Sequence, residues 1–159
     1  MRFHPKRWPA TDLLALLVLS SMTAFLATAA FVHAGVWTEK EPVVRMFLFY
    51  SESCSHCQEV MEDVLPVLRT KYGSQLEVML FEISDPINLR MLAALEKAYG
   101  VPMEQAVIPE IFVGRDVFLG GGAIAGELEA TIDEYLAQGG VDLTSPMRQA
   151  LEAAARLRE

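Results

Sequence analysis

The chain has 159 residues, of which 21 are acidic and 13 are lysine or arginine, so its formal net charge is −8. An acidic chain binds polyanions poorly, and we therefore expect no nucleic-acid partner. Two cysteines are too few for a disulfide framework or a four-thiolate zinc site. The length that remains after an apolar N-terminus suits one domain with one hydrophobic core.

The N-terminus combines a short basic stretch, residues 1–12, with an uncharged apolar stretch, residues 13–34. About 20 apolar residues span a bilayer as a helix, and basic residues ahead of them keep the N-terminus in the cytoplasm. We therefore expect a single transmembrane anchor at 13–34, a linker at 35–42, and an extracytoplasmic domain. The alternative is a cleaved signal peptide, since small residues near Ala30 and Ala34 offer cleavage sites, and the domain would then be periplasmic or secreted.

Hydrophobic patterning predicts alternating strands and helices over residues 43–140. The first half contains a strand at 43–50, a helix from the turn at 51–54 to Gly73, and a strand at 76–83. A helix capped by Asp85 and ended by Gly100 follows. The second half contains strands at 110–113 and 117–119, joined by a turn at 114–116, and a helix from the glycines 120–122 to Gly139. We expect Pro66 to kink the first helix. The order βαβαββα predicts an α/β domain with a central mixed sheet flanked by helices, in which the first two strands are parallel and the last two form a hairpin.

A helical extension follows at residues 141–159. Ser145 is the expected cap, and Pro146 suits the first turn of a helix that runs to about Arg158. Its apolar side comprises Met147, Ala150, Leu151, Ala154 and Leu157. This pattern allows packing on the domain, contact with a partner, or fraying in solution.

The two cysteines, Cys54 and Cys57, stand where the first strand ends and the first helix begins. Free N–H groups and the positive end of the helix dipole favour a thiolate at such a position. We therefore assign Cys54 as the nucleophile and Cys57, one turn later, as the resolving thiol of a disulfide exchange. His56, as a cation or a hydrogen-bond donor, is expected to stabilise the Cys54 thiolate.

The segment Val107-Ile108-Pro109-Glu110-Ile111 places a proline directly before the third strand. Together with the strand–CxxC–helix order and with Phe112-Val113-Gly114, it resembles the thioredoxin superfamily over about residues 43–137. The resemblance implies a thioredoxin-like fold, a redox-active disulfide between the two cysteines without another cofactor, and a cis bond before Pro109. It also implies a substrate groove, with Ser55, Ile108, Pro109 and Glu110 as its candidate residues. His56 matches the histidine of the Cys-Pro-His-Cys site in periplasmic disulfide oxidases.

Two features depart from that pattern. Leu48 stands where thioredoxins commonly carry a buried acid, so the proton acceptor for Cys57 is unassigned. Leu119-Gly120-Gly121, after Ile111-Phe112-Val113-Gly114, is more similar to glutaredoxins, whose paired glycines help hold glutathione. Glutathione is therefore the alternative ligand, although a glycine-rich helix start also occurs as a backbone device alone.

These observations predict an extracytoplasmic thiol–disulfide oxidoreductase acting through Cys54 and Cys57. Its expected partners are exported thiol or disulfide proteins, or a membrane partner that is a quinone-linked enzyme or a member of a dithiol relay. One alternative is a copper-handling thioredoxin-like protein, because soft thiolates suit Cu(I). The other is a non-catalytic thioredoxin-like scaffold.

Overall fold

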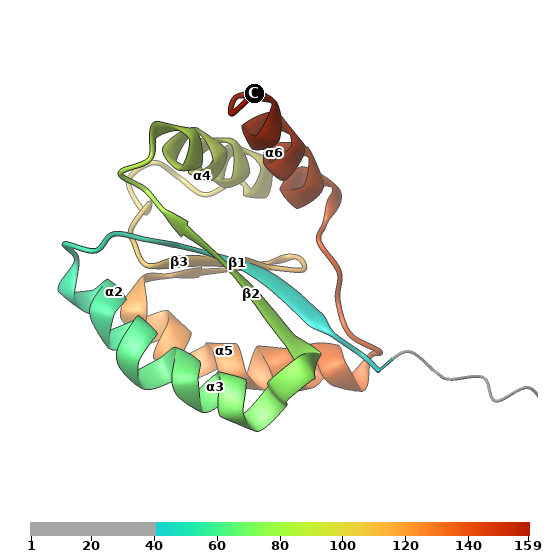
Figure 1. Cartoon of the computed structure of the whole chain (residues 1–159). Helices are drawn as coiled ribbons and strands as arrows, with labels where there is room; N and C mark the ends of the chain where they lie inside the picture. The colour runs from blue at the N-terminus through green and yellow to red at the C-terminus, as the bar shows by residue number, and fades with distance from the viewer. Residues whose placement is uncertain (1–40) are drawn as a thin grey trace, which may run out of the picture. The chain divides into compact units, whose positions relative to one another are not determined.

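The computed structural model describes residues 41–159 (Figure 1). The predictions for the basic stretch 1–12, the anchor or signal segment 13–34 and most of the linker 35–42 fall outside these residues. Within the described part of the chain, no helix is both long enough and apolar enough to cross a bilayer.

A four-stranded mixed sheet forms the middle layer, with the strand order β2-β1-β3-β4. The strands are β1 (Val44–Tyr50), β2 (Leu76–Glu82), β3 (Glu110–Val113) and β4 (Asp116–Leu119). β1 and β2 are parallel, with Val44 opposite Leu76, whereas β3 is antiparallel to both β1 and β4. The predicted parallel βαβ unit and the predicted hairpin are therefore confirmed.

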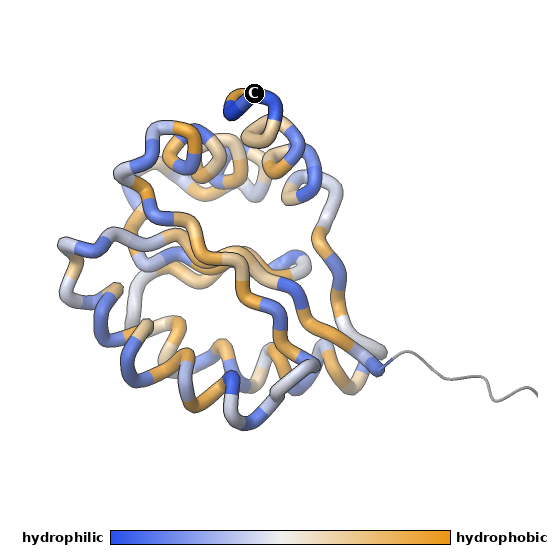
Figure 2. Tube along the Cα trace, viewed as in Figure 1, coloured by the Kyte–Doolittle hydropathy of each residue, from blue (hydrophilic) through white to orange (hydrophobic). Residues whose placement is uncertain are grey.

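Helices cover both faces of the sheet, as Figure 1 shows. On one face lie α2 (Ser55–Glu59), the π-helical turn η1 (Val60–Val64), α3 (Leu65–Tyr72) and α5 (Gly120–Ala137), and on the other lie α4 (Pro86–Tyr99) and α6 (Ser145–Arg156). A short 3-10 turn, η2 (Gly73–Gln75), joins α3 to β2. Figure 2 shows hydrophobic residues through the strands, whereas the helices alternate between hydrophobic and hydrophilic residues.

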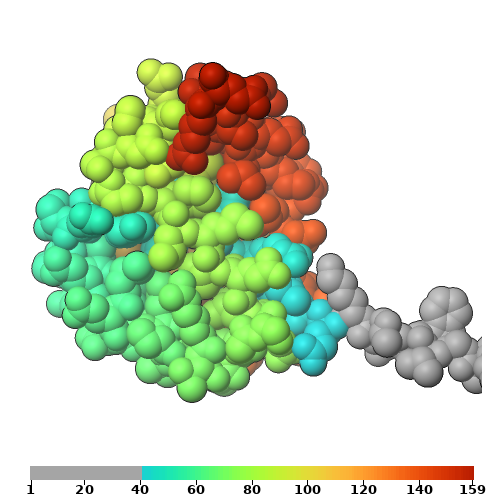
Figure 3. Space-filling view, in the orientation of Figure 1, coloured from blue at the N-terminus to red at the C-terminus, as the bar shows by residue number. Residues whose placement is uncertain are grey.

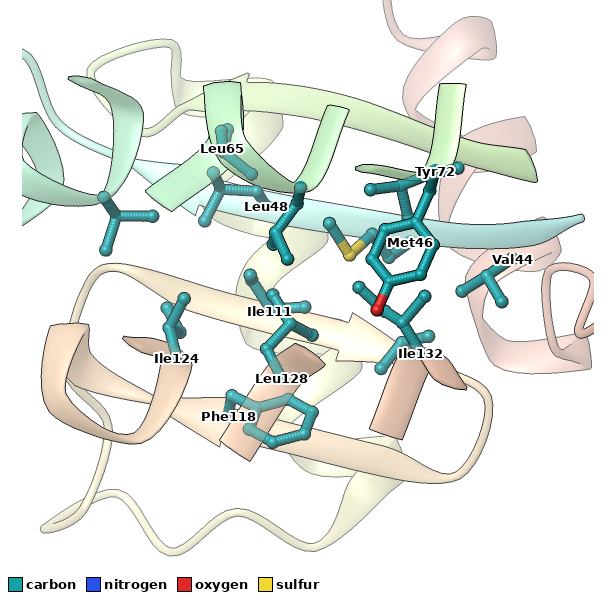
Figure 4. Close-up of a cluster of buried hydrophobic side chains, with 14 residues drawn as sticks. Val44, Met46, Leu48, Leu65, Tyr72, Ile111, Phe118, Ile124, Leu128 and Ile132 are labelled. Atoms are coloured by element: carbon teal, nitrogen blue, oxygen red, sulfur yellow. The ribbon is translucent and has the colours of Figure 1, made fainter. Parts of the chain in front are cut away.

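Alternate residues of β1 supply the two halves of the core, because successive side chains of a strand point to opposite faces. Val44, Met46 and Leu48 belong to the cluster under α3 and α5, which Figure 4 shows in close-up. Phe47 and Phe49 belong to the cluster under α4 and α6. All five side chains are fully buried, so β1 is the centre of the fold and carries the site at its carboxyl end.

The first long helical segment changes its hydrogen-bond pattern just before Pro66. Proline has no N–H, and its ring excludes the carbonyl four residues earlier. In η1 the Leu65 N–H bonds the Val60 carbonyl, five residues back. Such a widened turn is a known means of accommodating a disrupted helix ladder. The predicted irregularity at Pro66 therefore takes the form of a π-helical turn between α2 and α3.

The C-terminal helix α6 packs on the domain, which resolves the three possibilities that the sequence allowed. Met147, Ala150 and Ala154 are buried in the cluster shared with α4, and Figure 3 shows α6 in red beside α4 in yellow-green. The predicted cap Ser145 is wrong, because Thr144 accepts the bond from the Met147 N–H and Ser145 is the first helical residue. Arg158 lies just beyond the helix.

Candidate active site

Cys54 lies in the turn between β1 and α2, where it is the N-cap of the helix. Its backbone is extended, with φ −95° and ψ 117°, and its sulfur accepts the Cys57 N–H at 3.4 Å. The Cys54 N–H bonds the Ser51 carbonyl at 3.2 Å, which fixes the turn. Its side chain is half-buried. Cys54 therefore stands at the exposed start of a helix, where backbone N–H groups stabilise negative charge on sulfur.

Cys57 lies one turn further along α2 and is only 1% exposed. Both cysteines are free thiols in this structure. Burial, followed by hydrogen bonding with Cys54, raises the pKa of Cys57 to about 11, while a backbone bond from Ser51 opposes the shift. The pair thus combines an accessible thiol with a buried one that holds its proton at neutral pH.

Ile108 and Pro109, which we expect to line a substrate groove and call the groove wall, approach Cys54 through Ile108. Their peptide bond is cis, and the Cys54 thiol donates to the Ile108 carbonyl oxygen at 3.9 Å. The Pro109 carbonyl accepts the Gly120 N–H at 2.8 Å, which joins the groove wall to the start of α5. The expected cis bond is therefore confirmed, and the residue before it lies beside Cys54.

The start of α5 approaches α2 closely. A Cβ on Gly121 would lie 3.6 Å from both the Cβ and the carbonyl oxygen of His56 and 3.8 Å from Val60, and a Cβ on Gly120 would meet Val107 at 3.7 Å. The glycines therefore bring α5 to the edge of the site, and the structure places Gly120 inside the helix rather than ahead of it. Whether these glycines hold glutathione stays a prediction.

Ser55 and His56 are both exposed on the first turn of α2. Among residues 41–159 no hydrogen bond joins the His56 imidazole to Cys54, so its expected effect on the thiolate remains a prediction. Ser55 is exposed and follows Cys54 in the chain, and its place in a substrate groove stays a prediction.

Glu110 differs from its predicted place in the groove. Its side chain is 0% exposed, so it cannot contact a substrate at the surface, and the groove assignment is corrected. It shares a face of β3 with Phe112, toward α4 and α6, because alternate residues of a strand point the same way. A short strand in the middle of a sheet is covered on both faces, and that signal in the sequence could have indicated the burial.

A hollow of about 290 Å³ opens beside the buried cysteine. It is lined by Tyr50, Ser51, Glu52, Cys57, Gln58, Met61 and Glu62. Glu52 and Glu62 are exposed, and the Gln58 side chain donates to the Glu52 carbonyl at 2.9 Å. Beneath α2, on the other hand, Leu48 is fully buried in the apolar cluster. The hollow therefore offers polar groups at the surface beside Cys57.

The described residues offer the cysteine pair no additional metal ligands. Within residues 41–159, no three or more histidine, cysteine, aspartate or glutamate side chains gather where they could hold a metal ion. The copper-handling alternative expects a metal held by both thiolates and His56 as a further candidate ligand, and these three side chains do not gather into such a group.

No protein-family model matches this sequence, and no curated protein matches it. The fold and site nevertheless define a class of structure, a small mixed α/β domain with a CxxC pair at a helix start. That arrangement is compatible with a thioredoxin-like fold.

Proposed function

We propose that this chain is a thiol–disulfide oxidoreductase of the thioredoxin superfamily, with Cys54 as the nucleophile and Cys57 as the resolving thiol. The observation that carries the proposal is the asymmetry of the pair beside the groove wall. Cys54 is accessible at a helix N-terminus and 3.9 Å from the Ile108 carbonyl. Cys57 is 1% exposed one turn away.

The exchange proceeds in two balanced steps. The Cys54 thiolate attacks one sulfur of a partner disulfide, and the partner's other sulfur leaves as a thiolate. Cys57 then loses its proton and attacks the Cys54 sulfur, which forms the Cys54–Cys57 disulfide and releases the partner's second thiolate. Two electrons pass from the cysteine pair to the partner. The same steps in reverse oxidise a partner dithiol, and the reduction potential of the pair sets the direction.

The second step needs an outlet for the Cys57 proton, because the pKa of that thiol is raised to about 11. Leu48 supplies no buried base beneath α2. The hollow beside Cys57 is lined by the exposed acids Glu52 and Glu62, and water in it can accept the proton and pass it to solvent.

The domain is proposed to act outside the cytoplasm, held by the apolar segment 13–34 or released from it by cleavage. Its proposed partners are exported thiol or disulfide proteins, or a membrane redox partner of the quinone-linked or dithiol-relay kind. A reporter fused after Glu159 tests this placement, since it is active only if the domain is exported. Cytoplasmic reporter activity contradicts it.

The test of the proposed function compares two matched variants of the full-length chain. Cys57→Ser leaves the nucleophile and removes the resolving thiol, so it should accumulate mixed disulfides with partner proteins, visible on non-reducing gels. Cys54→Ser keeps only the buried thiol and should accumulate none. Equal accumulation by both variants contradicts the role assignment, and failure of wild type in an insulin-reduction assay contradicts a reductase.

A Cu(I) titration of the reduced chain separates the copper-handling alternative. Tight binding of Cu(I) in a chain that shows no disulfide exchange supports that alternative. A chain that neither exchanges disulfides nor binds Cu(I) supports the scaffold. Replacement of His56 by alanine, with the rate of Cys54 alkylation as the measure, tests the imidazole's expected effect separately.

A further inference from the structure

The carboxyl group of Glu110 is buried, which is unexpected for an acidic side chain. Its side chain is 0% exposed, and neither of its oxygens makes a hydrogen bond of ordinary geometry within residues 41–159, although the carboxyl group of Glu96 is close enough to interact with it. Nearly all buried polar groups in proteins are hydrogen-bonded, because burial of an unpaired one costs free energy. A native group in this position calls for a physical explanation.

The place of Glu110 in the chain connects it to the cysteine pair. It follows Pro109 directly, and it lies opposite Phe49 of β1 and Leu119 of β4. Ile108 packs against the same apolar cluster that contains Phe49. Glu110 is therefore two residues from Ile108, whose carbonyl oxygen lies 3.9 Å from the Cys54 sulfur.

The surroundings of Glu110 favour its neutral form. Burial is the main cause that raises its pKa to about 8, and the carboxyl group of Glu96 on α4 adds to the shift. The neighbours on β1 and β4 are the apolar Phe49 and Leu119, and no salt bridge within residues 41–159 includes Glu110. Tyr99 of α4 directs its hydroxyl to the Gly114 carbonyl instead.

We propose that Glu110 is a positioning residue that acts on Cys54 through the groove wall. As a neutral acid it stays in the apolar cluster and keeps Ile108 and Pro109 against the cysteine. As a carboxylate it faces the carboxyl group of Glu96, and no cation among residues 41–159 pairs with it. It then moves toward water and loosens the groove wall. The inference rests on the proposed function, because it treats Ile108 and Pro109 as part of the surface that contacts the substrate.

The hydrogen bond from the Gly120 N–H to the Pro109 carbonyl provides a measure that does not depend on thiol chemistry. We expect the protection factor of the Gly120 amide against hydrogen exchange, measured in the full-length chain, to fall in wild type as the pH rises from 6 to 9. In Glu110→Gln, which keeps the shape of the neutral acid, it should stay constant. The ratio between the two proteins should change at least tenfold, with a midpoint near pH 8.

Two further variants make the result specific. Glu96→Gln removes the facing carboxylate, so the midpoint should move to lower pH, and this variant also serves if Glu110→Gln does not fold. Glu104→Gln, an exposed neighbour on the loop before the groove wall, should behave as wild type. A ratio that does not change with pH, or a midpoint that Glu96→Gln leaves in place, overturns the inference.

A second measure connects the effect to the reactive thiol. The alkylation rate of Cys54 in wild type, divided by that in Glu110→Gln, should rise at least threefold between pH 6 and pH 9, because the thiol titration cancels in the ratio. A flat or falling ratio overturns the connection to Cys54. If the amide responds to pH while Cys57→Ser accumulates no mixed disulfide, the proposed function fails and the response of the groove wall stands.

Discussion

Replacement of Glu110 by glutamine should change how the stability of the whole domain depends on pH. In wild type the folded chain keeps the proton of Glu110 up to about pH 8, whereas the unfolded chain releases it near the ordinary value of 4.5. Between these values the folded state binds one proton more than the unfolded state. The free energy of unfolding therefore decreases as the pH rises through this interval, and Glu110 adds no further pH dependence below or above it.

The size of the effect follows from the width of that interval. One proton contributes about 1.36 kcal/mol for each pH unit. From pH 5 to pH 8, wild type should therefore lose up to about 4 kcal/mol of stability through this one group. Glu110→Gln lacks the titration, so its stability relative to wild type should rise by the same amount. The buried glutamine amide, which lacks a hydrogen-bond partner, changes the free energy of unfolding by the same amount at every pH. It therefore does not affect this difference.

The assay is guanidinium unfolding of the reduced full-length chain in non-ionic detergent, followed by far-ultraviolet circular dichroism from pH 5 to pH 8.5. Cys57 does not interfere, because its pKa rises from 9.0 to about 11 and acts above this range in both proteins. Glu104→Gln is the control and should follow wild type. Stability curves of wild type and Glu110→Gln that stay parallel within about 0.5 kcal/mol would refute the reasoning.

Three other substitutions test the packing. Gly140→Ala should lower the free energy of unfolding by about 2 kcal/mol or more, because φ is +88° and the new Cβ would lie 2.5 Å from the Val43 carbonyl oxygen; a smaller loss contradicts that geometry. Gly126→Ala, in open space on α5, should instead stabilise by about 0.5–1 kcal/mol. Tyr72→Phe should cost about 1 kcal/mol, since its hydroxyl donates to Asp133 at 2.7 Å. Chemical denaturation measures all three.

The sequence alone predicts most of the fold because its signals are local. Apolar runs locate the strands, and Asp85 is found as the cap of α4, where it accepts the Ile87 N–H at 2.8 Å. Gly100 ends that helix in the left-handed conformation at φ +74°. The misassigned cap of α6 shows the limit, since Thr144 and Ser145 are adjacent and both suit a cap. Only the backbone geometry distinguishes them.

The candidate site is less predictable, because it depends on residues that are distant in the chain. The helix-start position of Cys54 follows from local sequence, whereas the place of Ile108 and Pro109 near it is predicted only through a family resemblance. The same resemblance predicts a groove position for Glu110, because Glu110 directly follows Pro109. Its burial depends on β3 lying between β1 and β4 and under α4, and no pattern within a few residues encodes that arrangement.

The two unusual positions, Leu48 and Glu110, lie on opposite faces of the sheet. Leu48 makes the face under α2 apolar, so we propose that in the exchange the proton of Cys57, which finds no buried acceptor there among residues 41–159, leaves through the hollow to water. Glu110 places a buried acid on the other face, directly after the groove wall. On the proposed function, we expect the pH dependence of the resolving step to come from Cys57 itself and that of partner docking to come from Glu110. Because the two groups titrate on different faces, Glu110→Gln should alter docking and leave the resolving step unchanged.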